Sequence, residues 1–127
     1  MKVKEIYETA LSFLFEAPNE DRAFKQNTPK LLNVLMAEAL PYENTIRANN
    51  GENELLTSPT VKTLEDDVPF SNSVCRVALP YGLCSYFCSD DGDSYKSQDF
   101  RLRFVDALNE LSKVVTTDIT DEYGGEE

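Results

Sequence analysis

The sequence predicts an all-α protein, a small helical bundle of about four main helices with an irregular insert between the second and the third. Apolar residues recur at the 3.6-residue spacing of amphipathic helices, and this spacing is broken at Pro18, at Asn49 to Gly51 and at Gly92. With 127 residues, of which 41% are hydrophobic and 28% charged, the chain is long enough to bury one core. We therefore expect a helical domain over residues 1–115 and an acidic, flexible tail over residues 116–127.

The first helix is expected over residues 3–17, because apolar side chains form one broad face there. Pro18 and Asn19 should end it, and a short turn should follow. The second helix is expected to begin at Thr28 and Pro29, because threonine can cap a helix and proline at the first helical position loses no hydrogen bond. Pro41 should interrupt this helix, leaving residues 42–47 as a bent extension that closes at Asn49 to Gly51.

The insert covers residues 52–69 and contains the pairs Ser58-Pro59 and Val68-Pro69. Its apolar runs are short, which predicts a long loop holding a short strand pair or one helical turn. The acidic run Glu65-Asp66-Asp67 fits a solvated turn that caps the insert, and a site for a metal or a basic partner is the alternative.

Two further helices are expected after the insert. Asn72 or Ser73 should cap the third, and Pro80 should kink it or begin its main segment. Gly92 should end it in the left-handed conformation, after which Asp93 or Ser94 starts the fourth helix. The expected inward residues are Val74, Val77, Ala78, Tyr81, Cys84, Phe87 and Cys88 on the third helix, and Phe100, Phe104, Val105, Leu108, Leu111 and Val115 on the fourth.

Charge and hydropathy narrow the classes of partner. The net charge is −11 and the pI is about 4.4, so we expect no direct nucleic-acid binding, sequence-specific or otherwise, and a basic protein surface is the better partner. No apolar run approaches 18 residues, and the N-terminal segment is interrupted by charges. We therefore expect no membrane span, no signal peptide and an intracellular, soluble protein.

The residue types argue against catalysis. The chain has no histidine and no phosphate-binding glycine loop, so we expect no enzyme and no cofactor. A calcium loop starting at Asp91 would place Lys96 at its sixth position and Leu102 at its twelfth, where glycine and glutamate are needed. Cys84 and Cys88 are interpreted as small core residues, because two thiols alone do not complete a zinc site.

Two places are candidates for partner contact. Tyr86 lies off the main apolar stripe of the third helix, so its ring is a candidate for exposure. The tail has almost no apolar residues to bury but can gain charge-assisted contacts from a basic partner, and it should become ordered on docking. The candidate interface residues are Tyr86, Asp118, Ile119, Asp121, Glu122 and Tyr123.

The order of these features resembles the small head-tail connector, or adaptor, proteins of tailed bacteriophages and prophages. The resemblance covers most of the chain and rests on a series of segments taken in order. These are Lys4-Glu5-Ile6-Tyr7 with Ala10-Leu11, a break with Asp21, the helix from Pro29 to Leu35 followed by Glu38, the insert with Leu64-Glu65-Asp66-Asp67, the segment Leu79-Pro80-Tyr81-Gly82-Leu83, the acidic turn with Asp91 and Asp93, and a closing helix.

The resemblance implies a structural protein that forms a ring on the portal, joins head to tail and helps to retain packaged DNA. It also implies contacts with the portal, with neighbouring tail or neck proteins and with further copies of itself. The protein would then lie in the bacterial host cytoplasm during assembly and in the virion neck afterwards. A small acidic regulatory binder, such as a DNA-mimic inhibitor, is the alternative, and a metal-dependent enzyme using Asp and Glu pairs is a third possibility.

Overall fold

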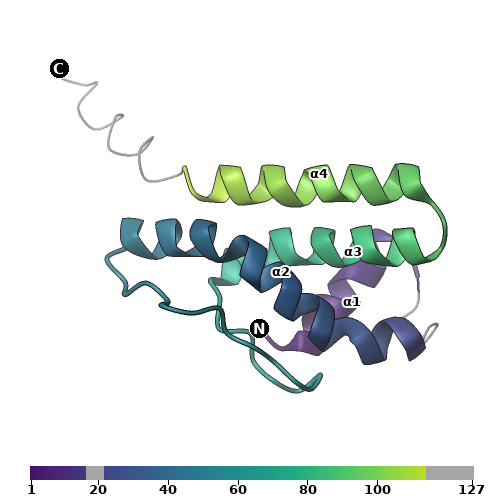
Figure 1. Cartoon of the computed structure of the whole chain (residues 1–127), viewed down its shortest axis with the longest axis horizontal. Coiled ribbons are helices and arrows are strands. Elements are labelled where there is room, and N and C mark those ends of the chain that lie inside the picture. The colour runs from purple at the N-terminus through teal and green to yellow at the C-terminus, as the bar shows by residue number, and fades with distance from the viewer. Residues whose placement is uncertain (17–21, 114–127) are drawn as a thin grey trace.

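Four α-helices and one π-helical turn make up the regular structure, which confirms the predicted all-α class. The computed structural model describes residues 1–16 and 22–113. Within these ranges the helices are α1 (Val3–Phe13), α2 (Arg22–Asn49), α3 (Leu79–Asp90) and α4 (Ser94–Leu111), and the π-helical turn η1 (Val74–Ala78) leads directly into α3. Helix α3 contacts α1, α2 and α4 and so lies at the centre of the bundle, with α4 along one side of it (Figure 1).

Helix α1 ends at Phe13, four residues earlier than the sequence predicts. Leu14 caps it, Phe15 adopts a left-handed φ of 58°, and Glu16 N–H donates to the Leu11 carbonyl at 3.0 Å. This is the helix-ending motif that usually has glycine at the left-handed position. The motif closes the helix before Pro18 and Asn19, which lie outside the described residues.

The prediction that the second helix starts at Thr28 and Pro29 is wrong. Helix α2 is continuous from Arg22 to Asn49 and contains both Pro29 and Pro41. The Thr28 hydroxyl donates back to the Phe24 carbonyl at 2.6 Å within the helix instead of capping its start. Each proline removes one backbone hydrogen bond, which bends a helix without ending it when tertiary packing supports both halves, and α2 changes direction along its course (Figure 1). The predicted end is confirmed, because Gly51 follows the last turn with a φ of 73°.

The insert forms neither of the elements that the sequence suggested. No strand or helical turn occurs over residues 52–69, and its regular pairing is one isolated antiparallel bridge between Lys2 and Asp67. The insert is instead fixed to the helices by side chains. Asn33 on α2 donates to the Val61 carbonyl at 3.0 Å and accepts from Val61 N–H at 2.7 Å, and Asn44 makes the same pair of bonds with Leu55.

Pro80 stands near the start of α3, as predicted, and the helix widens just before it. Because Pro80 has no N–H to donate, a regular α-helical bond is lost there, and the preceding turn is π-helical, with Leu79 N–H donating to the Val74 carbonyl. The wider turn changes which residues of this segment face the core. Val77, predicted to face inward, is 41% exposed, whereas Cys75 and Leu79 are buried.

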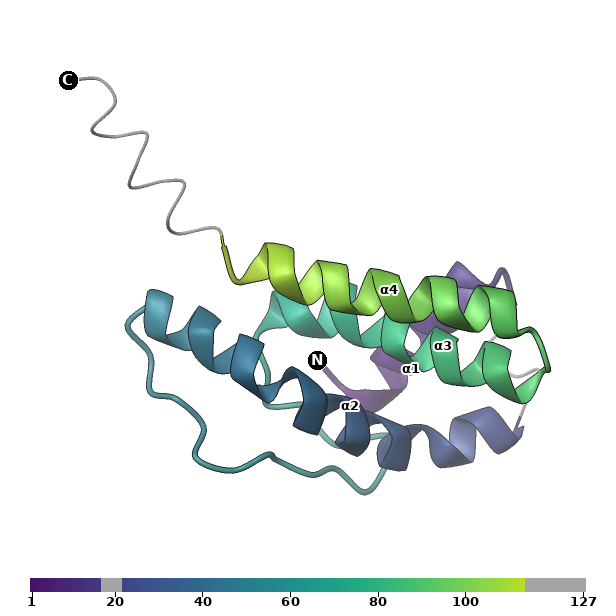
Figure 2. The same cartoon turned by 45° about the horizontal axis from the view of Figure 1, so that its top comes forward.

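The end of α3 and the start of α4 agree with the sequence, whereas α4 ends at Leu111, before the predicted Val115. Gly92 has a φ of 81°, and the Asp93 side chain caps α4 by accepting from Lys96 N–H at 3.0 Å. Phe104 and Leu108 are buried against the bundle, while Val115 lies outside the described residues. Figure 2 shows α4 alongside α3, with α2 on the other side of the bundle. A Cβ on Gly82 would lie 2.6 Å from Leu35 Cδ2, so this glycine permits the close approach of α3 to α2.

Candidate functional site

Tyr86 is the one predicted interface residue that the structure describes, and it lies in a groove between α2, α3 and α4. Its ring is half-buried and borders two cavities of about 500 and 300 Å³. The other predicted interface residues, Asp118, Ile119, Asp121, Glu122 and Tyr123, lie outside the described residues. Tyr86 is thus neither fully buried nor fully exposed, and its role in partner contact stays a prediction.

A salt bridge crosses the groove beside Tyr86. Arg101 on α4 donates through both terminal nitrogens to the two carboxylate oxygens of Glu38 on α2, at 2.8 and 2.9 Å. The Arg101 guanidinium also lies 5.3 Å from the centre of the Phe104 ring. Burial raises the pKa of Tyr86 above its usual value, the Glu38 charge adds to this effect and Arg101 opposes it. The phenol therefore stays neutral and can both donate and accept a hydrogen bond.

The two serine hydroxyl groups beside Tyr86 donate hydrogen bonds to backbone carbonyls. Ser85 Oγ donates to the Gly82 carbonyl at 2.8 Å, and Ser97 Oγ donates to the Ser85 carbonyl at 2.7 Å. The second of these bonds ties the first turn of α4 to α3. Ser97 therefore stabilises the packing of α4 on α3, and the groove offers a phenol, an ion pair and apolar surface for contact.

A second groove lies where the insert meets the first half of α2. Its walls are Lys25, Gln26, Pro29, Lys62, Thr63 and Leu64, and its volume is about 540 Å³. Sequence reasoning missed this groove, because its two lysines are 37 positions apart in the numbering and their neighbours give no local pattern.

The acidic turn at the end of the insert caps the backbone, as the sequence suggested. Asp66 accepts from Lys62 N–H at 2.7 Å and from Thr63 N–H at 2.9 Å, and these bonds lower the pKa of its carboxyl. Glu65 pairs with Lys4 at 3.2 Å and with Lys2 at 3.6 Å, and the hydrogen bond from Lys4 is the main cause of its lowered pKa. Over residues 1–16 and 22–113 there is no cluster of three or more metal-ligating side chains.

Glu43 is a fully buried carboxylate that sequence reasoning also missed. It accepts from Arg47 Nε at 2.8 Å, from Ser71 N–H at 3.0 Å and from Ser71 Oγ at 2.9 Å. Arg47 reaches further and donates to the Pro69 carbonyl at 2.9 Å. The spacing of Glu43 and Arg47 by four residues was the available signal. The cluster joins α2 to the end of the insert and so supports the start of the η1–α3 segment.

The three cysteines are buried free thiols, which confirms their interpretation as core residues. Cys84 Sγ donates to the Ala10 carbonyl at 3.2 Å and so links α3 to α1. Burial raises the pKa of the Cys75 thiol to about 11, and it also raises the pKa values of Cys84 and Cys88. All three are therefore protonated and unreactive at neutral pH.

Comparisons with protein-family models, with curated proteins and with solved structures each found no match to this chain. In the part of the chain that the structure describes, no helix is both long and apolar enough to span a membrane.

Proposed function

We propose that this protein is a structural head-tail connector, or adaptor, of a tailed bacteriophage or prophage. In this role it forms a ring on the portal, contacts neighbouring tail or neck proteins, and helps to join head to tail and to retain packaged DNA. It acts without catalysis, in the host cytoplasm during assembly and then in the virion neck.

The observation that carries the proposal is the exposed apolar surface on the outer sides of two different helices. Tyr95 and Leu102 are seven residues apart on α4, and their side chains are 84% and 64% exposed. Seven residues are close to two helical turns, so these two side chains lie on one stripe. Val34 is exposed on α2. A subunit within a ring contacts a neighbour on each side and therefore needs two separate contact surfaces.

The distribution of surface charge favours a connector over a DNA-mimic inhibitor. A DNA mimic needs a continuous acidic face, but several surface carboxylates here are balanced by cations. Glu38 pairs with Arg101, Asp99 pairs with Arg103, and Glu65 contacts two lysines. These pairs interrupt the negative surface along α4 and at the insert.

The proposal is tested by co-expressing the full chain with the portal protein encoded near it and examining the purified complexes by electron microscopy. We expect a ring of this protein on the portal, and we expect Leu102→Asp to weaken that ring without changing the thermal midpoint. Leu56→Asp is the matched control, because Leu56 is a 97% exposed leucine that belongs to the insert and to neither helix.

Failure to bind the portal would contradict the proposed function, as would a genomic neighbourhood without portal, capsid or tail genes. If Leu102→Asp assembled like the wild type, the outer face of α4 would not be a ring contact.

A further inference from the structure

We propose that the groove formed by Lys25, Gln26, Pro29, Lys62, Thr63 and Leu64 binds the acidic C-terminal segment, residues 116–127, of a neighbouring copy of this chain. The inference rests on the proposed function in that it supplies the contact by which copies assemble into a ring. We call this surface the lysine groove.

The lysine groove lies where the fold concentrates positive charge in an otherwise acidic protein. Lys25 comes from α2 and Lys62 from the insert, while Lys2 and Lys4 reach the same turn of the insert through Glu65. Lys2 and Lys4 are therefore already paired. The backbone N–H of Lys62 donates to the Asp66 carboxylate, but among the described residues the side-chain ammonium groups of Lys25 and Lys62 form no salt bridge within 4.0 Å. Both ammonium groups can therefore contact a ligand.

The backbone around the groove is held in place before any partner binds. The paired bonds between Asn33 and Val61 anchor the residue that precedes Lys62. On the far side of the turn, Lys4 N–H donates to the Leu64 carbonyl and Val3 N–H donates to the Asp66 carbonyl, both at 3.0 Å. An anchored groove loses less conformational freedom on binding than a free loop would.

The C-terminal segment has the complementary composition. Residues 116–127 contain five carboxylate side chains and neither lysine nor arginine. Two larger apolar residues, Ile119 and Tyr123, are interspersed among the acids and can cover Pro29 and Leu64 in the groove. At the net charge of −11, copies of this chain repel one another over most of their surfaces, so an acidic segment is attracted most strongly to such a cationic site.

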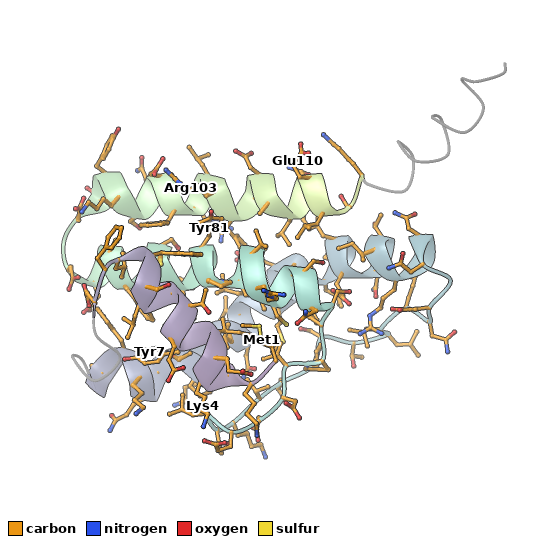
Figure 3. All side chains as sticks on the ribbon, turned by 180° about the vertical axis from the view of Figure 1, so that it is seen from behind. Met1, Lys4, Tyr7, Tyr81, Arg103 and Glu110 are labelled. Carbon is orange, nitrogen blue, oxygen red and sulfur yellow. The ribbon has the colours of Figure 1, made fainter. Side chains whose placement is uncertain are left out.

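The proposed ring favours a neighbouring copy over the same chain as the source of the segment. In the three views the end of α4 and the tip of the insert lie on opposite sides of the bundle, and Figure 3 shows Glu110 and Lys4 far apart on those two sides. The 14 residues after Lys113 span at most about 50 Å when extended, which is enough to reach the groove of an adjacent subunit as well as that of the same chain, and the cross-linking test below separates the two. Because the segment and the groove are different surfaces, the contact is head-to-tail, and its repetition closes into a ring when the rotation permits.

The test is a charge-swap experiment on the full chain, with mass measured by sedimentation velocity at low salt. One variant reverses the groove (Lys25→Glu/Lys62→Glu), and the other reverses the segment (Asp118→Lys/Asp121→Lys/Glu122→Lys). We expect the wild type to self-associate, each variant alone to associate about tenfold or more weakly, and an equimolar mixture of the two to recover association. Arg76→Glu/Lys96→Glu is the matched control, because it changes the net charge as the groove variant does but lies away from the groove, and it should associate like the wild type.

The inference is overturned if the wild type is monomeric at low salt, if the control loses association as fully as the groove variant, or if the mixture fails to recover it. A cross-link from the segment to the groove within a single copy would overturn it as well, since the segment would then bind its own chain. These results are distinguishable from failure of the proposed function, because portal binding is measured separately. A chain that binds the portal but does not respond to the charge swap keeps the connector function and loses this contact.

Discussion

Replacing Glu43 with alanine should destabilise the fold more than removal of any exposed ion pair. The Glu43 carboxylate is fully buried and accepts hydrogen bonds from Arg47 Nε, Ser71 N–H and Ser71 Oγ. Without it, a half-buried guanidinium and two groups of Ser71 lose their acceptor at the junction between α2, the insert and η1. The substitution therefore affects the segment that leads into the central helix α3.

The magnitude follows from the number and kind of these bonds. Each hydrogen bond to a charged group contributes about 1.5–3 kcal/mol, and breaking a buried ion pair by removing one partner costs about 3–5 kcal/mol. Water entering the site offsets part of the summed loss, so we expect Glu43→Ala to lower the free energy of unfolding by about 3–5 kcal/mol. At about 4 °C per kcal/mol for a domain of this size, the thermal midpoint should fall by roughly 12–20 °C.

The assay is urea denaturation of the full chain followed by circular dichroism at 222 nm. Glu38→Ala is the matched control, because Glu38 lies on α2 as Glu43 does and forms an exposed bidentate pair with Arg101 on α4. Its removal should lower the free energy of unfolding by at most about 1 kcal/mol. Glu43→Gln should fall between the two, since the amide keeps one acceptor oxygen for Ser71. If Glu43→Ala and Glu38→Ala lowered stability equally, the buried cluster would not support the fold as argued here.

Three further predictions concern packing, ionisation and the C-terminal segment. Gly82→Ala should lower the free energy of unfolding by about 1–3 kcal/mol, because its Cβ would meet Leu35 Cδ2 at 2.6 Å, and Leu35→Ala should be less damaging in that background than in the wild type. The free energy of unfolding should fall as the pH rises from 9 towards 11, because the unfolded chain releases the Cys75 proton near pH 9 whereas the folded thiol holds it until about pH 11. Chemical denaturation across this pH range should show a smaller fall for Cys75→Ser. Deleting residues 117–127 should leave the thermal midpoint nearly unchanged while weakening association with the portal, as added salt should in the intact protein; unfolding of the truncated chain in a thermal scan would contradict the first expectation.

The helix ends that could be predicted from the sequence are those determined by neighbouring residues. Gly92 adopts the predicted left-handed conformation, Gly51 adopts it too in the predicted closing turn, and Asp93 caps α4 through its own side chain. Each of these features depends on residues within one turn of the helix. Pro29 and Pro41 were misleading for the opposite reason, because α2 packs against α1, α3 and α4 and stays continuous across both prolines.

The contacts that position both grooves are between segments distant in sequence. Asn33 binds Val61 across 28 positions, Glu43 binds Ser71 across another 28, and Glu38 binds Arg101 across 63. No local pattern identifies such partners, so the anchored insert could not be anticipated. From the sequence, Tyr86 could be selected only because it lies off the apolar stripe, whereas its place beside the Glu38–Arg101 pair depends on how three helices pack.

Folding gives this acidic chain one groove bounded by lysines. Averaged over the sequence, the charge of −11 points towards basic partners and away from other copies of the chain. Folding separates the charges, because the insert returns to the start of α1 and to the first half of α2, bringing Lys62 next to Lys25 while Glu65 is neutralised by Lys2 and Lys4. Net charge therefore describes the average surface, whereas the proposed recognition between copies depends on this local grouping of lysines. A groove bounded by Lys25 and Lys62 in a repulsive background restricts attraction to one geometry, which is what assembly of a closed ring from identical subunits requires.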